Sequence, residues 1–445
     1  MNALILGAGK VGYSIASLLS KERHHVTVVE PNPDRARVVE DALDVRVVVG
    51  NGACSEIINK CNIKSTDLLV AVTAHDEVNM LACLLAKQAG VPKTVARIRN
   101  PEYAMDENLL KNPSLGIDLA INPEKVTAKE ISQLLHYPEA MDVNYYADGK
   151  LLMLGLRVQE DNPIIGKLVK ELSGTKDYVI VAILRQNKVV IPRGDDVIGE
   201  NDQLLIMMKK EKVKDVEGYL GFTHRKIESC MILGGNRLTY YLAQYLLEEE
   251  LDVKIIEPNY EECKKLSGLL DGGIILNGDI GDIDLLRDEG ISDTDALIAL
   301  TDDDKLNVLT CLLAKQLGAK NPVAQIRRSD YMPLIQQVGI GICVSPQQLT
   351  AEAILKFVRK GKYLSISIIE NGGAEAYEVV LTEKMTKLVN KKIMDIRFPK
   401  GAIIGSIFRE DEAIIPSGSD VLLAGDRLVV FTSAERIGKI DAIFS

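Results

Sequence analysis

Three glycines near the start of the chain have the spacing of a phosphate-binding turn. Gly7, Gly9 and Gly12 form a G-x-G-x-x-G pattern that follows the apolar run 3–6 and begins a helical repeat of apolar residues. The first glycine permits a sharp turn, the second lets a pyrophosphate approach the backbone, and the third lets the helix pack closely on the strand. A phosphate there would meet unpaired amides at a helix N-terminus. The pattern therefore favours a dinucleotide over a simple tight turn, which is the alternative.

An acidic residue follows at the position that such a site needs. Glu30 ends the second apolar run, eighteen residues after Gly12. A carboxylate there can accept both ribose hydroxyls of an adenosine and disfavours a 2′-phosphate, so NAD or NADH is favoured over NADP.

Further candidates stand where later strands should end, because ligands of open α/β sheets bind at the carboxyl edge. Asn51 could flank the adenine, and the polar residues after the fourth strand could bond ribose, phosphate or nicotinamide. Helix capping is the alternative for Asp76 and Asn79, and a surface ion pair is the alternative for the two arginines after the fifth strand. The candidate nucleotide-binding residues are Gly7, Gly9, Lys10, Val11, Gly12, Glu30, Asn51, Thr73, Asp76, Asn79, Arg97 and Arg99.

No catalytic constellation accompanies this pattern. A hydride-transfer enzyme needs an acid or base and a substrate clamp near the nicotinamide, and no such arrangement stands out. The seven cysteines include no C-x-x-C pair. We therefore predict neither catalytic residues nor a metal site.

The sequence contains an internal duplication. The segment "LACLLAKQAG" at 81–90 returns as "LTCLLAKQLG" at 309–318, and "VVEPN" at 28–32 returns as "IIEPN" at 255–259. "VVIPRGDDVIGENDQLLI" at 189–206 matches "AIIPSGSDVLLAGDRLVV" at 413–430, so the duplication reaches the C-terminal part. Two tandem repeats are therefore expected.

Each repeat has two parts. Short Val-, Ile- and Leu-rich runs alternate with helix-length segments in the first part, which predicts a doubly wound parallel sheet of the α/β class with helices on both faces. The second part predicts a small α+β module. The expected boundaries are 1–138 and 139–213 for the first Rossmann-like domain and its small module, 214–226 for a linker, and 227–360 and 361–445 for the second pair.

The second copy departs from the glycine pattern. In "ILGGNRLTYYLAQYLL", Asn236 stands where Gly9 stands and Thr239 where Gly12 stands, and Gln325 replaces Arg97. An asparagine would crowd a pyrophosphate, and a threonine would push the helix from its strand. We expect the tight nucleotide site in the first repeat and a weaker or purely structural one in the second repeat. The residues of this second candidate site are Gly234, Gly235, Asn236, Arg237, Glu257, Asp279, Thr301 and Asn307.

Composition excludes several classes of protein. The 445 residues carry a formal net charge of −10, which argues against a large nucleic-acid interface. No segment reaches the roughly 18 apolar residues of a membrane span, and the first residues lack the features of a signal peptide. We expect a cytoplasmic protein.

The duplicated segments "LILGAGKVGYSIASLL", "VVEPN", "AVTAHDEVNMLACLLAKQAG" and "ARIRNPEY", with the small "VVIPRGDDVIGENDQLLI" module, resemble the family of Trk potassium-uptake regulatory subunits, TrkA. Its members contain tandem RCK (regulator of K+ conductance) units, each a Rossmann-like part and a TrkA-C part. The resemblance implies a subunit without enzymatic turnover, peripheral on the inner face of the cell membrane. It implies binding of NAD or NADH, or of ATP and ADP, and control of a TrkH- or TrkG-like potassium transporter. It also implies a homotetrameric ring of eight RCK units, in which Arg97 and Arg99 can reach a ligand of a neighbouring unit.

Two other functions share many of these residues. An NAD-dependent dehydrogenase also uses G-x-G-x-x-G with an acidic residue, but the duplication and the absence of a catalytic dyad speak against it. An RCK-type regulator of another cation channel or exchanger would share nearly all of them.

Overall fold

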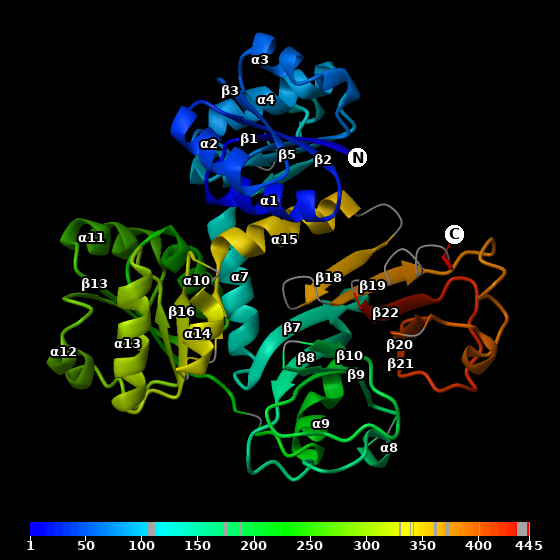
Figure 1. Cartoon of the computed structure of the whole chain (residues 1–445). Coiled ribbons are helices and arrows are strands. Elements are labelled where there is room, and N and C mark those ends of the chain that lie inside the picture. Colours follow the sequence, from blue (N-terminus) through cyan, green and yellow to red (C-terminus); the bar gives the residue numbers. More distant parts are fainter. Residues whose placement is uncertain are drawn as a thin grey trace. The chain divides into compact units, whose positions relative to one another are not determined.

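The computed structural model describes residues 1–445 except 106–109, 111, 173–175, 187, 224, 329–330, 339, 341, 360–362, 370–373, 400, 434–442 and 445. Two compact units emerge from the contacts: residues 1–132 with 228–358, and residues 133–227 with 359–445. Each unit therefore joins corresponding parts of the two sequence copies (Figure 1). We call the two Rossmann-like parts of the first unit the first half (1–132) and the second half (228–358).

The first half is a six-stranded parallel sheet in the order β3-β2-β1-β4-β5-β6. Its strands are β1 (Asn2–Leu6), β2 (His25–Glu30), β3 (Arg46–Val49), β4 (Leu68–Ala71), β5 (Lys93–Arg97) and β6 (Leu119–Ile121). Its helices are α1 (Lys10–Lys21), α2 (Pro33–Ala42), α3 (Ser55–Lys60), α4 (Asp76–Gln88), α5 (Pro101–Met105) and α7 (Pro123–Leu135). All four residues of β4 are buried, as expected for a strand with helices on both faces. The strand order reverses between β1 and β4, and a ligand crevice lies at such a point.

The second half repeats this topology in the order β14-β13-β12-β15-β16-β17. Its strands are β12 (Ser229–Leu233), β13 (Asp252–Glu257), β14 (Ile274–Asn277), β15 (Ala296–Ala299), β16 (Asn321–Gln325) and β17 (Ile342–Val344). Its helices are α10 (Arg237–Glu248), α11 (Tyr260–Leu269), α12 (Ile283–Asp288), α13 (Asp304–Gln316), α14 (Met332–Gln337) and α15 (Pro346–Arg359). The predicted fold class is confirmed.

The second unit contains two antiparallel five-stranded sheets, in the orders β10-β9-β11-β8-β7 and β18-β19-β22-β20-β21. The first module consists of β7 (Ala140–Tyr146), β8 (Leu151–Arg157), α8 (Val169–Leu172), β9 (Tyr178–Arg185), β10 (Lys188–Val190), β11 (Gln203–Lys209) and α9 (Val213–Tyr219). The second consists of β18 (Ser365–Ile369), β19 (Ala374–Val380), β20 (Ala402–Arg409), β21 (Glu412–Ile414) and β22 (Arg427–Ser433). One apolar core joins them: it contains Val181 and Met207 of the first module and Ala376 and Phe431 of the second.

Two features of this unit differ from the sequence analysis. Strand β7 was not predicted, because its buried residues Ala140, Val143 and Tyr146 do not alternate along the chain. A register shift also falls between Ala140 and Asp142. Helix α9 lies largely within the stretch 214–226 that we expected to be a linker, and its Val216 is buried.

Two helices run from the first unit into the second. The division falls between Ser132 and Gln133 inside α7, and between Val358 and Arg359 inside α15. Three residues of α7 and one residue of α15 therefore lie beyond the division.

A buried asparagine holds the carboxyl ends of β4 and β5 together. Asn79 is fully buried; its Oδ1 accepts from the Thr73 amide at 2.9 Å, and its Nδ2 donates to the Arg97 carbonyl at 2.9 Å. Asn307 makes the same two bonds in the second half, with Thr301 and Gln325.

The substitutions Asn79→Ala and Asn307→Ala should therefore each destabilise the first unit. Each leaves buried backbone groups without a partner, at a cost of about 2–4 kcal/mol. Urea denaturation of each single variant tests this, with Asn51→Ala as an exposed control. Single variants as stable as the control would contradict it.

Candidate functional site

The three glycines of the first loop differ in what a side chain would meet. Gly7 has a φ of +100°, a conformation that side chains rarely adopt. At Gly12 an added Cβ would lie 1.9 Å from the Gly7 carbonyl oxygen, so only glycine lets α1 start this close to β1. At Gly9 an added Cβ would meet no protein atom within 4 Å, and its φ of −66° suits any residue. Packing therefore explains Gly7 and Gly12 but not Gly9.

The acidic residue at the end of β2 is buried beside this loop. Glu30 is 4% exposed, and its carboxylate accepts from the Ala8 amide at 2.7 Å and the Asn32 amide at 3.0 Å. These bonds hold the carboxylate at the carboxyl edge of the sheet, where an adenosine ribose would lie.

The candidates after β4 bond mainly to the protein itself. Thr73 donates its hydroxyl to Asn79 at 2.7 Å, and Asp76 accepts from the Arg99 and Asn100 amides at 2.8 and 2.7 Å. Asn51 accepts from the Ala53 amide at 2.9 Å. These side chains shape the loops around the crevice, and their direct contact with a ligand stays a prediction.

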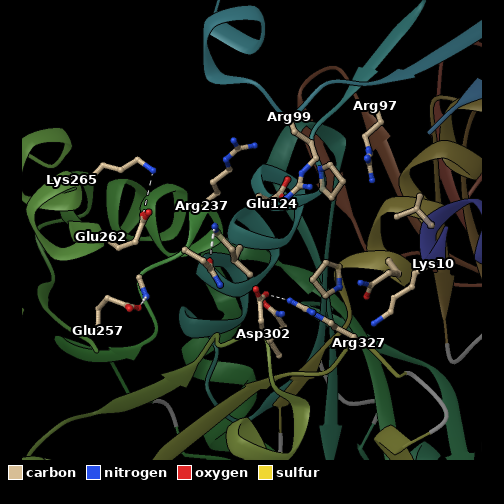
Figure 2. Close-up of a pocket in the computed structure, with 18 residues that line it drawn as sticks. Lys10, Arg97, Arg99, Glu124, Arg237, Glu257, Glu262, Lys265, Asp302 and Arg327 are labelled. Atoms are coloured by element: carbon tan, nitrogen blue, oxygen red, sulfur yellow. Dashed lines mark hydrogen bonds and ion pairs between the residues drawn. The ribbon is translucent and has the colours of Figure 1, made fainter. Parts of the chain in front are cut away.

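A cavity of about 730 Å³ in the first unit is lined by residues of both halves (Figure 2). Lys10, Val11, Arg97 and Arg99 of the first candidate site reach it. Gly235, Asn236, Arg237 and Glu257 of the second candidate site line it as well. The other candidates in either half do not line it. The cavity therefore adjoins the second glycine-containing loop more closely than the first.

The cavity is rich in cations. Its lining has six basic residues, Lys10, Arg97, Arg99, Arg237, Lys265 and Arg327, against four acidic ones, Glu124, Glu257, Glu262 and Asp302. Figure 2 shows the labelled side chains of both halves around it, with Arg327 paired to Asp302 and Lys265 to Glu262. Arg99 pairs with Glu124 at the start of α7.

Three polar atoms around the cavity lack a partner. They are the buried Nε of Arg97, the Nε of Arg99 and Oε2 of Glu124. The pKa of Arg97 lies below its ordinary value, first because burial removes water from the guanidinium and then because Arg99 is nearby. Burial and Arg99 lower the pKa of Arg327 in the same way. An anion in the cavity would relieve this repulsion between the halves.

Sequence reasoning missed five of the ten charged side chains of the cavity: Glu124, Glu262, Lys265, Asp302 and Arg327. Arg327 corresponds to Arg99 in the duplicated alignment, so the repeat itself could have indicated it. Nothing local in the sequence marks Glu124 or Lys265, because the cavity brings them together from distant segments. Among the described residues, no cluster of His, Cys, Asp and Glu could hold a metal ion.

The comparisons with known proteins agree with this architecture. The TrkA-N domain matches residues 3–123 and 230–346, and the TrkA-C domain matches residues 153–221 and 376–445. A Trk system potassium uptake protein TrkA homolog 1 of Methanosarcina mazei is 37% identical, covering all of both chains. The Trk system potassium uptake protein TrkA of Vibrio alginolyticus is 34% identical over all of this chain and 98% of its own.

Solved structures share the fold. The GsuK channel bound to NAD matches with a TM-score of 0.63 and 19% identity, covering all of this chain and 78% of that one. The GsuK channel bound to ADP matches with a TM-score of 0.52 and 14% identity, covering 80% and 69%.

The geometry of the first loop predicts losses of different size for two alanine substitutions. Gly12→Ala should lower the free energy of unfolding by about 1–3 kcal/mol, because its Cβ overlaps the Gly7 carbonyl. Gly9→Ala should cost less than about 1 kcal/mol, since its Cβ enters open space and only the helix start is affected. Thermal unfolding of the ligand-free variants measures both. Equal losses would show that the packing difference is absent.

Proposed function

Because the chain belongs to the TrkA family of Trk potassium-uptake proteins, we propose that it is a regulatory subunit without enzymatic turnover that binds an adenine nucleotide and thereby controls potassium flux. The membrane partner in this proposal is a TrkH- or TrkG-like potassium transporter. The chain would act on the inner face of the cell membrane. Among the described residues, no helix has the length and apolar character of a membrane span.

The observation that carries the nucleotide proposal is the open position at Gly9. Gly9 is exposed and no protein atom lies within 4 Å of where its Cβ would be, so a phosphate group could approach the backbone of the loop. The space adjoins the N-terminus of α1, whose first amides suit a pyrophosphate, and the Glu30 carboxylate beside the loop would accept from the ribose hydroxyls. NAD or NADH is the proposed ligand, with ATP and ADP as alternatives.

Coupling to the transporter would run through α7. Its first turn carries Glu124, which pairs with Arg99 at the cavity, and the same helix continues into the second unit. A ligand that draws Arg99 toward a phosphate would compete with this pair. Such a ligand shifts the protein between two states only by its difference in affinity for them.

The titration of the purified chain with NADH, NAD, ATP and ADP tests the nucleotide proposal. At least one should bind, and NADPH should bind at least about tenfold more weakly than NADH because Glu30 repels its 2′-phosphate, a difference of about 1.4 kcal/mol. Calorimetry measures the affinities. The absence of binding by all four would refute the nucleotide-dependent function.

Potassium flux through a reconstituted TrkH- or TrkG-like protein tests the coupling separately. Addition of the chain with the bound nucleotide should change the flux relative to the chain alone. Binding that leaves the flux unchanged would keep the nucleotide site but refute its control of transport.

The surface of α4 and α13 supports assembly of several copies. Leu81 on α4 is 44% exposed and Leu309, at the equivalent position of α13, is 63% exposed. Val78 and Leu306, one helical turn earlier, are half-buried. Apolar side chains at the same outward positions of both halves are suited to a repeating contact, and we propose a homotetramer that forms a ring of eight RCK units.

The double substitution Leu81→Asp and Leu309→Asp should break this assembly, because carboxylates would be buried in the contact. Light scattering after size exclusion should show a fall in molar mass from four chains to two or one. Val38→Asp, at a 62% exposed position on α2, is the control and should leave the mass unchanged. An unchanged mass of the double variant would refute assembly through these helices.

A further inference from the structure

The helices at the ligand crevice begin differently in the two halves. In the first half, α1 and α4 follow β1 and β4, between which the strand order reverses, and neither Gly9 nor His75 caps its helix through a side chain. In the second half, Asn236 caps α10 and Asp303 caps α13. Asn32 and Asn259 cap α2 and α11 alike, whereas α3 begins without a side-chain cap and Asp282 caps α12.

Asn236 takes the amides that a pyrophosphate would use. Its Oδ1 accepts from the Leu238 amide at 2.9 Å and the Thr239 amide at 3.2 Å, and its Nδ2 donates to the Leu300 carbonyl at 2.5 Å. Both the oxygen and the nitrogen of the Asn236 side-chain amide are therefore hydrogen-bonded within the protein. At the equivalent place in the first half, Gly9 leaves open space.

Thr239 reinforces the difference. Its hydroxyl donates to the Gly234 carbonyl at 2.5 Å and is fully buried. At the equivalent Gly12, a Cβ would overlap the corresponding carbonyl. The start of α10 therefore stands farther from its loop than the start of α1, as the sequence analysis expected.

The charge of Asp303 also disfavours a phosphate in the second half. Asp303 places a carboxylate on the first amides of α13, accepting from Lys305 at 2.8 Å and Leu306 at 3.3 Å. A carboxylate satisfies those donors and repels a phosphate. At the equivalent position of the first half, the His75 side chain makes no bond to the first amides of α4.

From this contrast we infer that Asn236 is the residue that closes the second half to nucleotides, its side-chain amide standing in for the pyrophosphate, so that each chain binds one nucleotide, at Gly9. The inference rests on the proposed nucleotide-binding function and adds to it the stoichiometry and the residue that sets it. The first half of the duplicated chain then binds the nucleotide, and in the second half the Asn236 side chain permanently occupies the loop.

A reciprocal exchange of these residues tests the inference, with NADH as the fluorescent probe. Wild-type protein should bind one NADH per chain, and Gly9→Asn should weaken binding at least a hundredfold while raising the melting temperature of the ligand-free chain through its new cap. The triple variant Gly9→Asn, Asn236→Gly and Thr239→Gly should again bind one NADH per chain, now in the second half.

Asn259→Gly in the Gly9→Asn background is the matched control. It removes an equivalent cap from α11 without opening the second loop, so it should restore no binding. Two NADH per wild-type chain, wild-type affinity in Gly9→Asn, or failure of the triple variant to recover binding would each overturn the inference.

The outcomes also separate the inference from the proposed function. If wild-type protein does not bind NADH but Asn236→Gly with Thr239→Gly does, the closure by Asn236 stands and the assignment of the first half falls. If no variant binds, both fall.

Discussion

The first amides of a helix that follows a parallel strand must find acceptors, and this requirement governs the structure at the crevice. In the first half α1 begins at Gly9 without a side chain to supply one, and in the second half Asn236 supplies it. An uncapped start costs stability unless a ligand completes it, whereas a capped start is stable alone. The two halves share one fold but satisfy this requirement in different ways.

The second constraint is electrostatic. Arg97, Arg99 and Arg327 come from both halves to one cavity, where burial and mutual repulsion lower the pKa values of Arg97 and Arg327. Only some of these charges are neutralised by Glu124 and Asp302. Helix α7 begins beside this cluster, with Glu124 in its first turn, and its last three residues belong to the other unit.

Parts of the site escaped prediction because their roles depend on distant partners. Asn79 and Asp76, whose contact with a ligand stays a prediction, also bond the loops after β4 and β5, which the sequence did not indicate. Glu124 and Lys265 have no local signature. Strand β7 was missed because its buried residues do not alternate as they do in a regular half-buried strand.

The sequence by itself determined the duplication, the class and strand content of the Rossmann-like halves, and the loss of two glycines in the second copy. These properties are local, because they depend on spacing and periodicity along the chain. Only the tertiary structure decided which parts form each unit and which side chains line the cavity. It also decided that Gly9 faces open space while Asn236 fills its own loop, because these facts depend on distances between segments that the sequence does not order in space.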